Sequence, residues 1–289
     1  MKKILITGAN SYIGTSFEKW VMDPRFDGKY WVDTVDMRGE EWRKRDFSQY
    51  DVVFHVAGIA HQKETMKNIE QYYKVNRDLA IETALKAKTE WVKQFVFLSS
   101  MSVYGIKEGG INSQTMEAPK SNYGKSKLEA ETEILRMATD DFRIAILRPP
   151  MVYGHGCKGN YKRLSHYAKK LPVFPDIHNK RSMIYIENLC MFVQSIIDNG
   201  KSGLYCPQDP EYVCTSKMVR DIADMTGHRI IMIPLWDGVS KIFPISIIKK
   251  VFGSLYYENF DVCKQFYTYN QSLIRTEKIG RQGESQKNE

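Results

Sequence analysis

Short apolar runs alternate with amphipathic stretches along the first half of the chain. Runs rich in Val, Ile, Leu and Phe are typical of buried strands, and apolar residues at helical spacing indicate helices between them. We expect strands at residues 2–7, 30–37, 50–58, 93–100 and 142–149. We expect helices at residues 14–22, 72–88 and 121–138. Strands that alternate with helices predict the α/β class, with a doubly wound parallel sheet covered on both faces.

The pattern becomes less regular beyond about residue 150. Residues 153–181 are interpreted as loop and helix, residues 182–198 as a strand followed by a helix, and residues 216–227 as an amphipathic helix. This part is too short and too interleaved for an independent domain, so we interpret it as a small C-terminal α/β lobe built on the sheet. The polar end, residues 281–289, is expected to be frayed.

The composition is that of a soluble globular protein: of 289 residues, 43% are hydrophobic and 26% are charged. The first apolar run stops at Thr7, which is too short for a signal peptide or a membrane span, so a cytoplasmic protein without stable membrane insertion is expected. The five cysteines are odd in number and form no CxxC pair, so neither a disulfide framework nor a metal site is predicted.

The formal net charge of +8 favours an anionic partner. The basic residues are spread in short groups rather than gathered in one tract with interleaved aromatic residues, so nucleic-acid binding is not expected. The basic and apolar stretch at residues 242–257 is interpreted as a packed helix rather than a membrane contact. A small anionic ligand is therefore the favoured partner.

The sequence GANSYIG, residues 8–14, directly follows the first predicted strand. A dinucleotide-binding loop uses one glycine for the tight turn, one for close approach to the pyrophosphate and one for packing of the helix on the strand. Here Gly8 and Gly14 hold the two ends, and Ser11 stands where a middle glycine is expected. The loop alone is a weak indication of a nucleotide site.

Two charged residues at the end of the second predicted strand bear on the choice of dinucleotide. Asp36 lies about 20 residues beyond the glycine loop and suits the ribose hydroxyls of NAD. Arg38 would instead suit the 2′-phosphate of NADP. NAD is favoured and NADP is the alternative.

Tyr123 and Lys127 lie four residues apart in a predicted helix, so their side chains share one face. A neighbouring positive charge favours the phenolate, and lowering a tyrosine pKa by about three units corresponds to roughly 4 kcal/mol. Such a pair makes a base that works near neutral pH. Ser99, Ser100 and Ser102 end a predicted strand, where a hydroxyl can donate to a reacting oxygen.

Seven motifs in their order and spacing resemble the extended short-chain dehydrogenase/reductases of the nucleotide-sugar epimerase/dehydratase family, in particular its UDP-glucose 4-epimerase-like members. These motifs are TGANSYIG, DVVFHVAG, YYKVNRDLA, LSSMSVYG, YGKSK, LRPPMVYGHGCKGN and RSMIYIENL. The resemblance extends to about residue 260, beyond which the Gly-Trp-x-Pro ending of the family is missing. It implies a Rossmann core at 1–155 with sheet elements returning near 181–200, an interleaved substrate lobe at 156–280 and a tail at 281–289.

The resemblance also assigns roles to individual residues. It makes Tyr123 the acid/base, Lys127 the group that lowers its pKa and binds the nicotinamide ribose, and Ser100 the catalytic hydroxyl that also contacts substrate. The implied cofactor-binding residues are Gly8, Ser11, Tyr12, Ile13, Gly14, Asp36, Asp46, Ala57, Gly58, Asn76, Tyr123 and Lys127. Asp46 would contact the adenine, although a loop-capping role remains open. Asn160 and Arg181 would hold the nucleotide diphosphate of the substrate.

The implied activity is NAD-dependent epimerisation at C4 of a nucleotide-activated sugar, with UDP as the expected nucleotide, through a transient 4-keto intermediate. The alternative is an NAD(P)H-dependent reductase of a UDP-4-keto-6-deoxy sugar, and a second alternative is a non-catalytic dinucleotide sensor. A dehydratase is disfavoured because Met101 and Ser102 replace the expected acidic pair. A homodimer is usual for the family and is expected here.

Overall fold

The computed structural model describes residues 1–60, 64–66, 68–234, 253–258, 260 and 265–285. The chain divides into two compact units that are interleaved in sequence. Unit 1 comprises residues 1–105, 116–149 and 189–207, and unit 2 comprises residues 106–115, 150–188 and 208–289. The core and lobe boundaries expected from the sequence stay a proposal.

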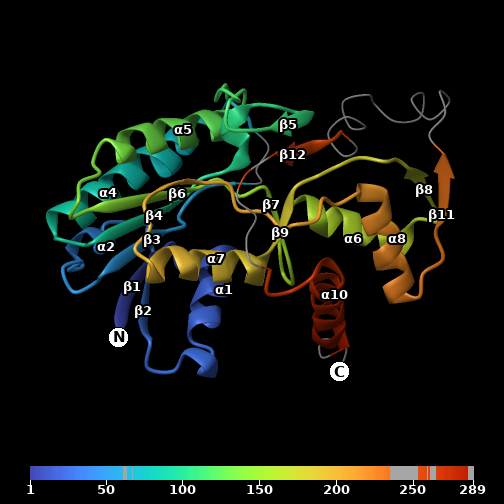
Figure 1. The fold of residues 1–289 in the computed structure, drawn as a ribbon, viewed down its shortest axis with the longest axis horizontal. Coiled ribbons are helices and arrows are strands. Elements are labelled where there is room, and N and C mark those ends of the chain that lie inside the picture. The colour runs from blue at the N-terminus through green and yellow to red at the C-terminus, as the bar shows by residue number, and fades with distance from the viewer. Residues whose placement is uncertain (61–63, 67, 235–252, 259, 261–264, 286–289) are drawn as a thin grey trace. The chain divides into compact units, whose positions relative to one another are not determined.

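Unit 1 is built on a six-stranded sheet in the order β10-β6-β4-β3-β1-β2 (Figure 1). The strands are β1 (Lys2–Thr7), β2 (Tyr30–Val35), β3 (Val52–His55), β4 (Gln94–Leu98), β6 (Arg143–Leu147) and β10 (Gly203–Tyr205). All neighbouring strands are parallel. The strand order reverses between β1 and β3, which is where doubly wound sheets bind ligands. The predicted fold class is confirmed.

Helices cover both faces of this sheet, with α4 (Leu79–Thr89) and α5 (Asn122–Leu135) on one face and α1 (Tyr12–Val21) on the other (Figure 1). The part of α7 (Ile186–Asp198) that belongs to unit 1 lies on the same face as α1. Short segments complete the unit. They are η1 (Pro24–Phe26), α2 (Glu41–Lys44), α3 (Ile69–Tyr72), η2 (Tyr73–Asp78) and η3 (Met101–Tyr104).

Two elements of unit 1 differ from the sequence prediction. Residues 72–88 were expected to form one helix, but η2 is a π-helical segment that separates α3 from α4. The strand that returns to the edge of the sheet is β10, outside the range 181–200. Two of its three residues are exposed, so it carries no apolar run that a sequence pattern detects.

The described residues of unit 2 include three two-stranded sheets and three helices. The strand pairs are β5 (Gly109–Ile111) with β12 (Leu255–Tyr257), β7 (Met151–Tyr153) with β9 (Met183–Tyr185), and β8 (Val173–Asp176) with β11 (Ile231–Pro234). The helices are α6 (Asn160–Lys170), α8 (Thr215–Thr226) and α10 (Tyr269–Ser285). The buried carboxylate of Glu277 on α10 accepts from Tyr161 Oη at 2.6 Å and Lys169 Nζ at 2.7 Å, which ties α10 to α6.

Two sequence expectations for unit 2 concern segments that lie partly outside the described residues. Most of the stretch 242–257, interpreted as a packed helix, lies outside them, and its last three residues form β12. Residues 281–285, expected to be frayed, continue α10, and residues 286–289 lie outside the description.

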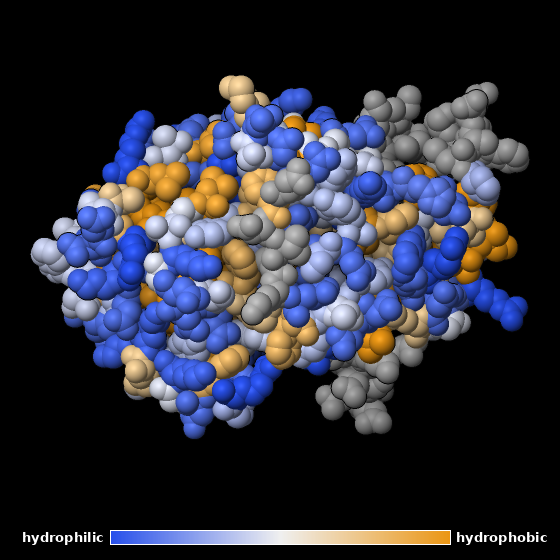
Figure 2. Space-filling view, viewed as in Figure 1, coloured by the Kyte–Doolittle hydropathy of each residue, from blue (hydrophilic) through white to orange (hydrophobic). Residues whose placement is uncertain are grey.

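Hydrophilic residues cover most of the face seen in Figure 2. Apolar residues gather at its upper left, over α4 and α5, and at its right edge, over β8 and β11, where Val173 and Ile231 are exposed. Among the described residues, no helix combines the length and the apolar composition needed to span a bilayer.

Candidate active site

The glycine loop follows β1 at the carboxyl edge of the sheet. Gly8 has a φ of +109°, a conformation that L side chains rarely adopt. A Cβ added there would lie 2.8 Å from the backbone nitrogen of Ala57, just beyond β3. The tight turn after β1 therefore depends on glycine for both its conformation and its space.

Ser11 is the N-cap of α1, and its hydroxyl accepts a hydrogen bond from Gly14 N at 3.1 Å. A Cβ on Gly14 would lie 2.6 Å from Ser11 Oγ and 3.1 Å from Ile6 Cγ2, so this glycine packs the helix against β1. Tyr12 and Ile13 begin the helix, whose N-terminal N–H groups favour an anion. The missing middle glycine is thus replaced by a residue that caps the helix.

Asp36 and Arg38 form an ion pair just beyond β2. Arg38 Nη2 lies 2.5 Å from Asp36 Oδ2, and Arg38 N donates to Asp36 Oδ1 at 2.9 Å. These hydrogen bonds lower the pKa of Asp36 to about 2, so its carboxylate is ionised at neutral pH. The two residues that the sequence set against each other as NAD and NADP determinants are in direct contact.

Asp46 lies on the surface of the turn that precedes β3. Its carboxylate accepts from Ser48 N at 2.8 Å and from Ser48 Oγ at 2.6 Å, and these hydrogen bonds lower its pKa. The loop-capping role that the sequence left open is therefore present in the structure. Its contact with an adenine stays a prediction.

Asn76 is fully buried within the π-helical segment η2. Its Oδ1 accepts from Ile59 N at 2.7 Å and its Nδ2 donates to Ile59 O at 3.1 Å, so it fixes the backbone that follows Gly58. A Cβ on Gly58 would lie 3.0 Å from Asn76 Oδ1 and 3.3 Å from Lys127 Nζ. The segment after β3 therefore passes close to both predicted site residues. Short π-helical segments such as η2 are frequent at functional sites.

Ser100, Tyr123 and Lys127 come together where β4 ends beside α5. Burial raises the pKa of the Tyr123 phenol, and a hydrogen bond with Ser100 acts in the opposite direction. Lys127 is 4% exposed, donates to Leu98 O at 2.8 Å and lies with Nζ 4.6 Å from the centroid of the Phe97 ring. Burial lowers the pKa of Lys127 to about 8. The arrangement places a hydroxyl, a phenol and a buried lysine that is mostly protonated at pH 7 at one edge of the sheet.

Several buried polar residues around this group were not predicted from the sequence. His55 ends β3 and is fully buried, with Nδ1 2.8 Å from Thr7 Oγ1, and Phe95 stacks on its ring. Burial, with a smaller contribution from the charge of Lys127, lowers the pKa of His55 to about 3, so the ring is neutral. Glu131 lies one turn beyond Lys127 on α5 and is also buried. Its spacing in YGKSKLEAE was visible in the sequence, but its partners come from other strands.

The two predicted diphosphate-binding residues both belong to unit 2. Asn160 is exposed and begins α6 after Gly159, whose φ is +91°. Arg181 is half-buried and bridges β12, and its Nη1 donates to Gly253 O at 2.9 Å. Burial lowers the pKa of Arg181. Their roles toward a diphosphate stay predictions.

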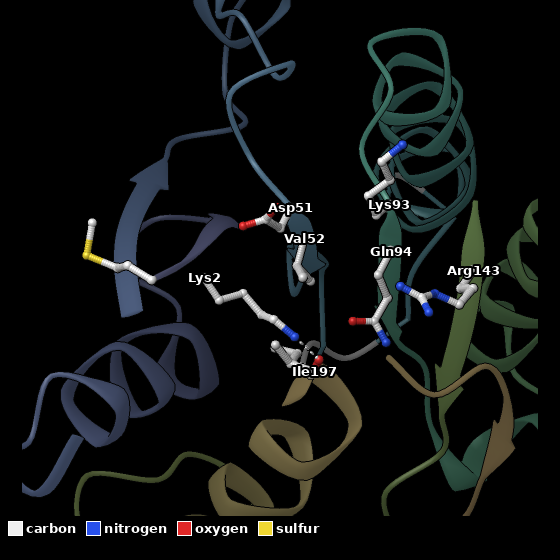
Figure 3. A pocket seen from close by; sticks show the side chains of 8 residues that line it. Lys2, Asp51, Val52, Lys93, Gln94, Arg143 and Ile197 are labelled. Carbon is white, nitrogen blue, oxygen red and sulfur yellow. Dashed lines mark hydrogen bonds between the residues drawn. The ribbon is translucent and has the colours of Figure 1, made fainter. Parts of the chain in front are cut away.

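A cavity of about 330 Å³ lies at the opposite, amino edge of the sheet in unit 1 (Figure 3). Its lining includes Lys2, Gln94 and Arg143, at the starts of β1, β4 and β6, together with Ile197 near the end of α7. Lys2 Nζ donates to Ile197 O at 2.7 Å. None of the predicted catalytic residues lines this cavity.

Comparison with known proteins finds relatives that match most of the chain. The UDP-glucose 4-epimerase of Vibrio cholerae is 28% identical over 278 residues, which cover 87% of this chain and 83% of that protein. A 4-epimerase of N-acetyl-glucosaminyl-diphospho-undecaprenol from Escherichia coli O157:H7 is 24% identical and covers 88% of this chain and 82% of its own length. The crystal structure of a UDP-glucuronic acid 4-epimerase from Bacillus cereus in complex with NAD matches with a TM-score of 0.73 at 17% identity, over 97% of this chain and 99% of that chain.

Residues 4–205 match the model of the NAD dependent epimerase/dehydratase family. This match spans the glycine loop, the end of β4 and the Tyr123 helix, and it confirms the prediction of an enzyme made from those motifs. The chain belongs to the NAD dependent epimerase/dehydratase family.

Proposed function

We propose that this protein is an NAD-dependent epimerase that inverts C4 of a UDP-activated sugar through a transient 4-keto intermediate. The observation that carries the proposal is that Ser100, which bonds to Tyr123, and Leu98, whose carbonyl accepts from Lys127 Nζ, both lie at the end of β4. The three predicted catalytic side chains therefore share the carboxyl edge of the sheet. The similarity to UDP-sugar 4-epimerases along most of the chain supports the choice of reaction.

The residues of this edge fit a dinucleotide. Gly8 and Gly14 leave room where side chains would meet Ala57 or β1, and the α1 N-terminus supplies N–H groups for a pyrophosphate. Asp36 is ionised and stands where a ribose is expected. Bound NAD would accept hydride from the sugar carbon and return it to the opposite face.

Side chains of the protein would transfer the proton that moves together with the hydride. Tyr123 would take the proton of the C4 hydroxyl and return it after the sugar has turned in the site. The Lys127 ammonium would stabilise the phenolate, which burial alone disfavours. Ser100, already bonded to Tyr123, would donate to the developing oxygen. Asn160 and Arg181 are proposed to hold the diphosphate, because a guanidinium matches its charge and geometry.

A reductase of a UDP-4-keto-6-deoxy sugar is the second candidate, and Arg38 favours it. The Arg38 side chain is 85% exposed and lies beside Asp36, where it can meet the 2′-phosphate of NADP. In that reaction Tyr123 would act only as the acid. A homodimer and a cytoplasmic location remain parts of the proposal that rest on the sequence.

The first experiment is to denature freshly purified protein and identify the small molecules that it releases. Stoichiometric NAD is expected, because an epimerase recycles its cofactor in place. Release of none, with reversible binding of NADPH or NADH, would support the reductase, and failure to bind any dinucleotide would contradict both. Conversion of UDP-glucose, UDP-N-acetylglucosamine and UDP-glucuronic acid to their C4 epimers, followed by NMR, then identifies the sugar.

A further inference from the structure

Three polar residues form one stripe along α5. Tyr123, Lys127 and Glu131 are spaced four residues apart, so they lie on the same helix face. Glu131 is 1% exposed and Lys127 is 4% exposed. A buried carboxylate that follows a buried ammonium by one helical turn needs a reason, since each charge is costly to bury without compensation.

Consecutive residues at the end of β4 each bond to one member of this stripe. The pairs are Leu98 O with Lys127 Nζ, Ser99 Oγ with the Glu131 carboxylate, and Ser100 with Tyr123. The pairing brings the strand end and the helix into one fixed register. A shift of α5 along β4 would break all three contacts together.

The neighbouring strand holds Glu131 from a second side. Arg148 follows β6, is 3% exposed, and donates to Glu131 through Nε at 3.1 Å and Nη2 at 2.5 Å. Arg148 Nη1 also donates to Tyr104 Oη at 2.9 Å and to Glu117 Oε1 at 2.7 Å. Glu131 is thus bonded to residues that follow both β4 and β6, whose backbones meet where Ser99 N donates to Leu147 O at 2.7 Å.

Of the described residues that face Lys127, Glu131 supplies the negative charge that favours the protonated form of the lysine. From β3, His55 is neutral and carries no negative charge. From α5 itself, the phenol of Tyr123 is neutral, and from β4 the uncharged carbonyl of Leu98 and the ring of Phe97 meet the ammonium. Glu131 is the carboxylate that opposes the effect of burial on Lys127.

We infer that Glu131 is a positioning residue for the proposed reaction: its carboxylate fixes α5 against the ends of β4 and β6 and compensates the buried ammonium of Lys127. The inference rests on the proposed acid/base role of Tyr123. It assigns Glu131 no contact with substrate or cofactor. Its two parts, register and charge, are separable by substitution.

The charge is tested with Glu131→Gln, which keeps the shape and removes the negative charge. The pKa of Lys127 is measured directly by NMR of lysine labelled at Cε, with Lys127→Met to assign the signal. We expect this pKa to fall by about one unit or more. Because Lys127 must be protonated to stabilise the phenolate, the alkaline limb of the kcat profile should move to lower pH by the same amount.

The matched control is Glu133→Gln on the same helix, where the carboxylate is exposed and pairs with Arg136. It should leave the Lys127 pKa and kcat unchanged. The register is tested with Ser99→Ala, which removes the donor to Glu131 without a change of charge. This variant should lower kcat roughly 3- to 10-fold, the equivalent of one hydrogen bond, with the Lys127 pKa retained. Glu131→Asp, which keeps the charge on a shorter side chain, should behave like Ser99→Ala.

If the Glu131→Gln protein does not fold, we attribute the failure to Arg148, because this buried cation has lost one of its two carboxylate partners and keeps only Glu117. The double variant Glu131→Gln with Arg148→Met removes both charges and should fold. It should show a smaller fall of the Lys127 pKa in the same direction, because Arg148 also loses its positive charge.

The inference is overturned if folded Glu131→Gln matches Glu133→Gln in both the Lys127 pKa and the pH profile. The proposed function fails separately, if Tyr123→Phe retains turnover, and the NMR titration still tests the effect of Glu131 on Lys127 in that case. If the pKa of Lys127 falls but the alkaline limb of the kcat profile does not move, the effect of the Glu131 charge on Lys127 is supported. The role of that effect in turnover is then contradicted.

Discussion

The two edges of the sheet in unit 1 differ in whether their charged side chains are buried or exposed. At the carboxyl edge, Lys127, Glu131 and Arg148 are buried and bonded to defined partners. At the amino edge, the cavity in Figure 3 is lined by Arg143 and Asp51, which are both exposed. This cavity lies at one edge and the predicted catalytic residues lie at the other, so the cavity does not coincide with the candidate active site.

Strand direction explains this difference. In a parallel sheet the helices that follow the strands begin at the carboxyl edge, where their N–H groups and the loop side chains face a ligand. The amino edge receives helix C-termini instead, and there Lys2 Nζ donates to Ile197 O near the end of α7. A cation that binds a helix end stabilises the fold without any need for a substrate.

The largest effect is expected from Tyr123→Phe at the carboxyl edge. Loss of the phenolic proton removes general acid/base catalysis, so kcat should fall about 10³- to 10⁴-fold while bound dinucleotide is retained. Turnover is measured with the UDP-sugar that the NMR screen described above identifies, and cofactor content by release on denaturation. The control is Tyr167→Phe on the exposed side of α6, which should keep full activity. Full activity of Tyr123→Phe would remove the basis for assigning chemistry to this edge.

The second prediction compares glycines at the two edges. Gly8→Ala and Gly28→Ala both place a side chain at positive φ, which costs about 1 kcal/mol or more. Only at Gly8 would the new Cβ meet backbone, at 2.8 Å from Ala57 N, whereas nothing lies within 4 Å of Gly28. We expect Gly8→Ala to weaken dinucleotide binding at least about 10-fold, the equivalent of 1.4 kcal/mol. Equal affinities in the two variants, measured by calorimetry, would show that the loop after β1 does not cradle the cofactor.

The third prediction concerns acid stability. His55 stays neutral in the fold with its pKa lowered to about 3, whereas in the unfolded chain it takes up a proton below about pH 6.5. The contribution of His55 to the unfolding free energy is therefore complete above pH 6.5 and is lost as pH falls toward 3. The loss at pH 4 is about 3 kcal/mol. In His55→Gln, the drop in unfolding free energy between pH 7 and pH 4 should shrink by about that amount. Urea unfolding at both pH values measures it, with exposed His166→Gln as the control. An unchanged pH dependence in His55→Gln would contradict a neutral buried ring.

The sequence was most informative where local pattern and tertiary environment coincide. The strands of residues 2–7, 52–55 and 94–98 are buried along most of their length, so they stand out as apolar runs. Tyr123 and Lys127 could be predicted as a pair on one helix face because their four-residue spacing is a local property, and both lie on α5. The predicted helix at 72–88 missed the π-helical segment because Asn76 is held by Ile59, a contact between residues 17 apart in sequence. Glu131 was missed for the same reason, since Arg148 and Ser99 come from other strands.

The smallest effect is expected at the amino edge, and β6 supplies a matched pair to measure it. Arg143 begins this strand and is exposed at the cavity, whereas Arg148 directly follows it and is buried against Glu131. Arg148→Met should destabilise the protein by about 3–5 kcal/mol, because it leaves a buried carboxylate without its cation. Arg143→Met should change the unfolding free energy by about 0.5 kcal/mol or less.

Turnover of Arg143→Met should also stay within about two-fold of the parent, because that substitution touches none of the contacts among Ser100, Tyr123 and Lys127. Urea unfolding and kcat at saturating substrate measure both quantities on the same preparation. A fall in kcat of ten-fold or more in a protein of unchanged stability would mean that the cavity takes part in function. The division of labour between the two edges would then be wrong, since charge at the amino edge would matter for more than holding α7.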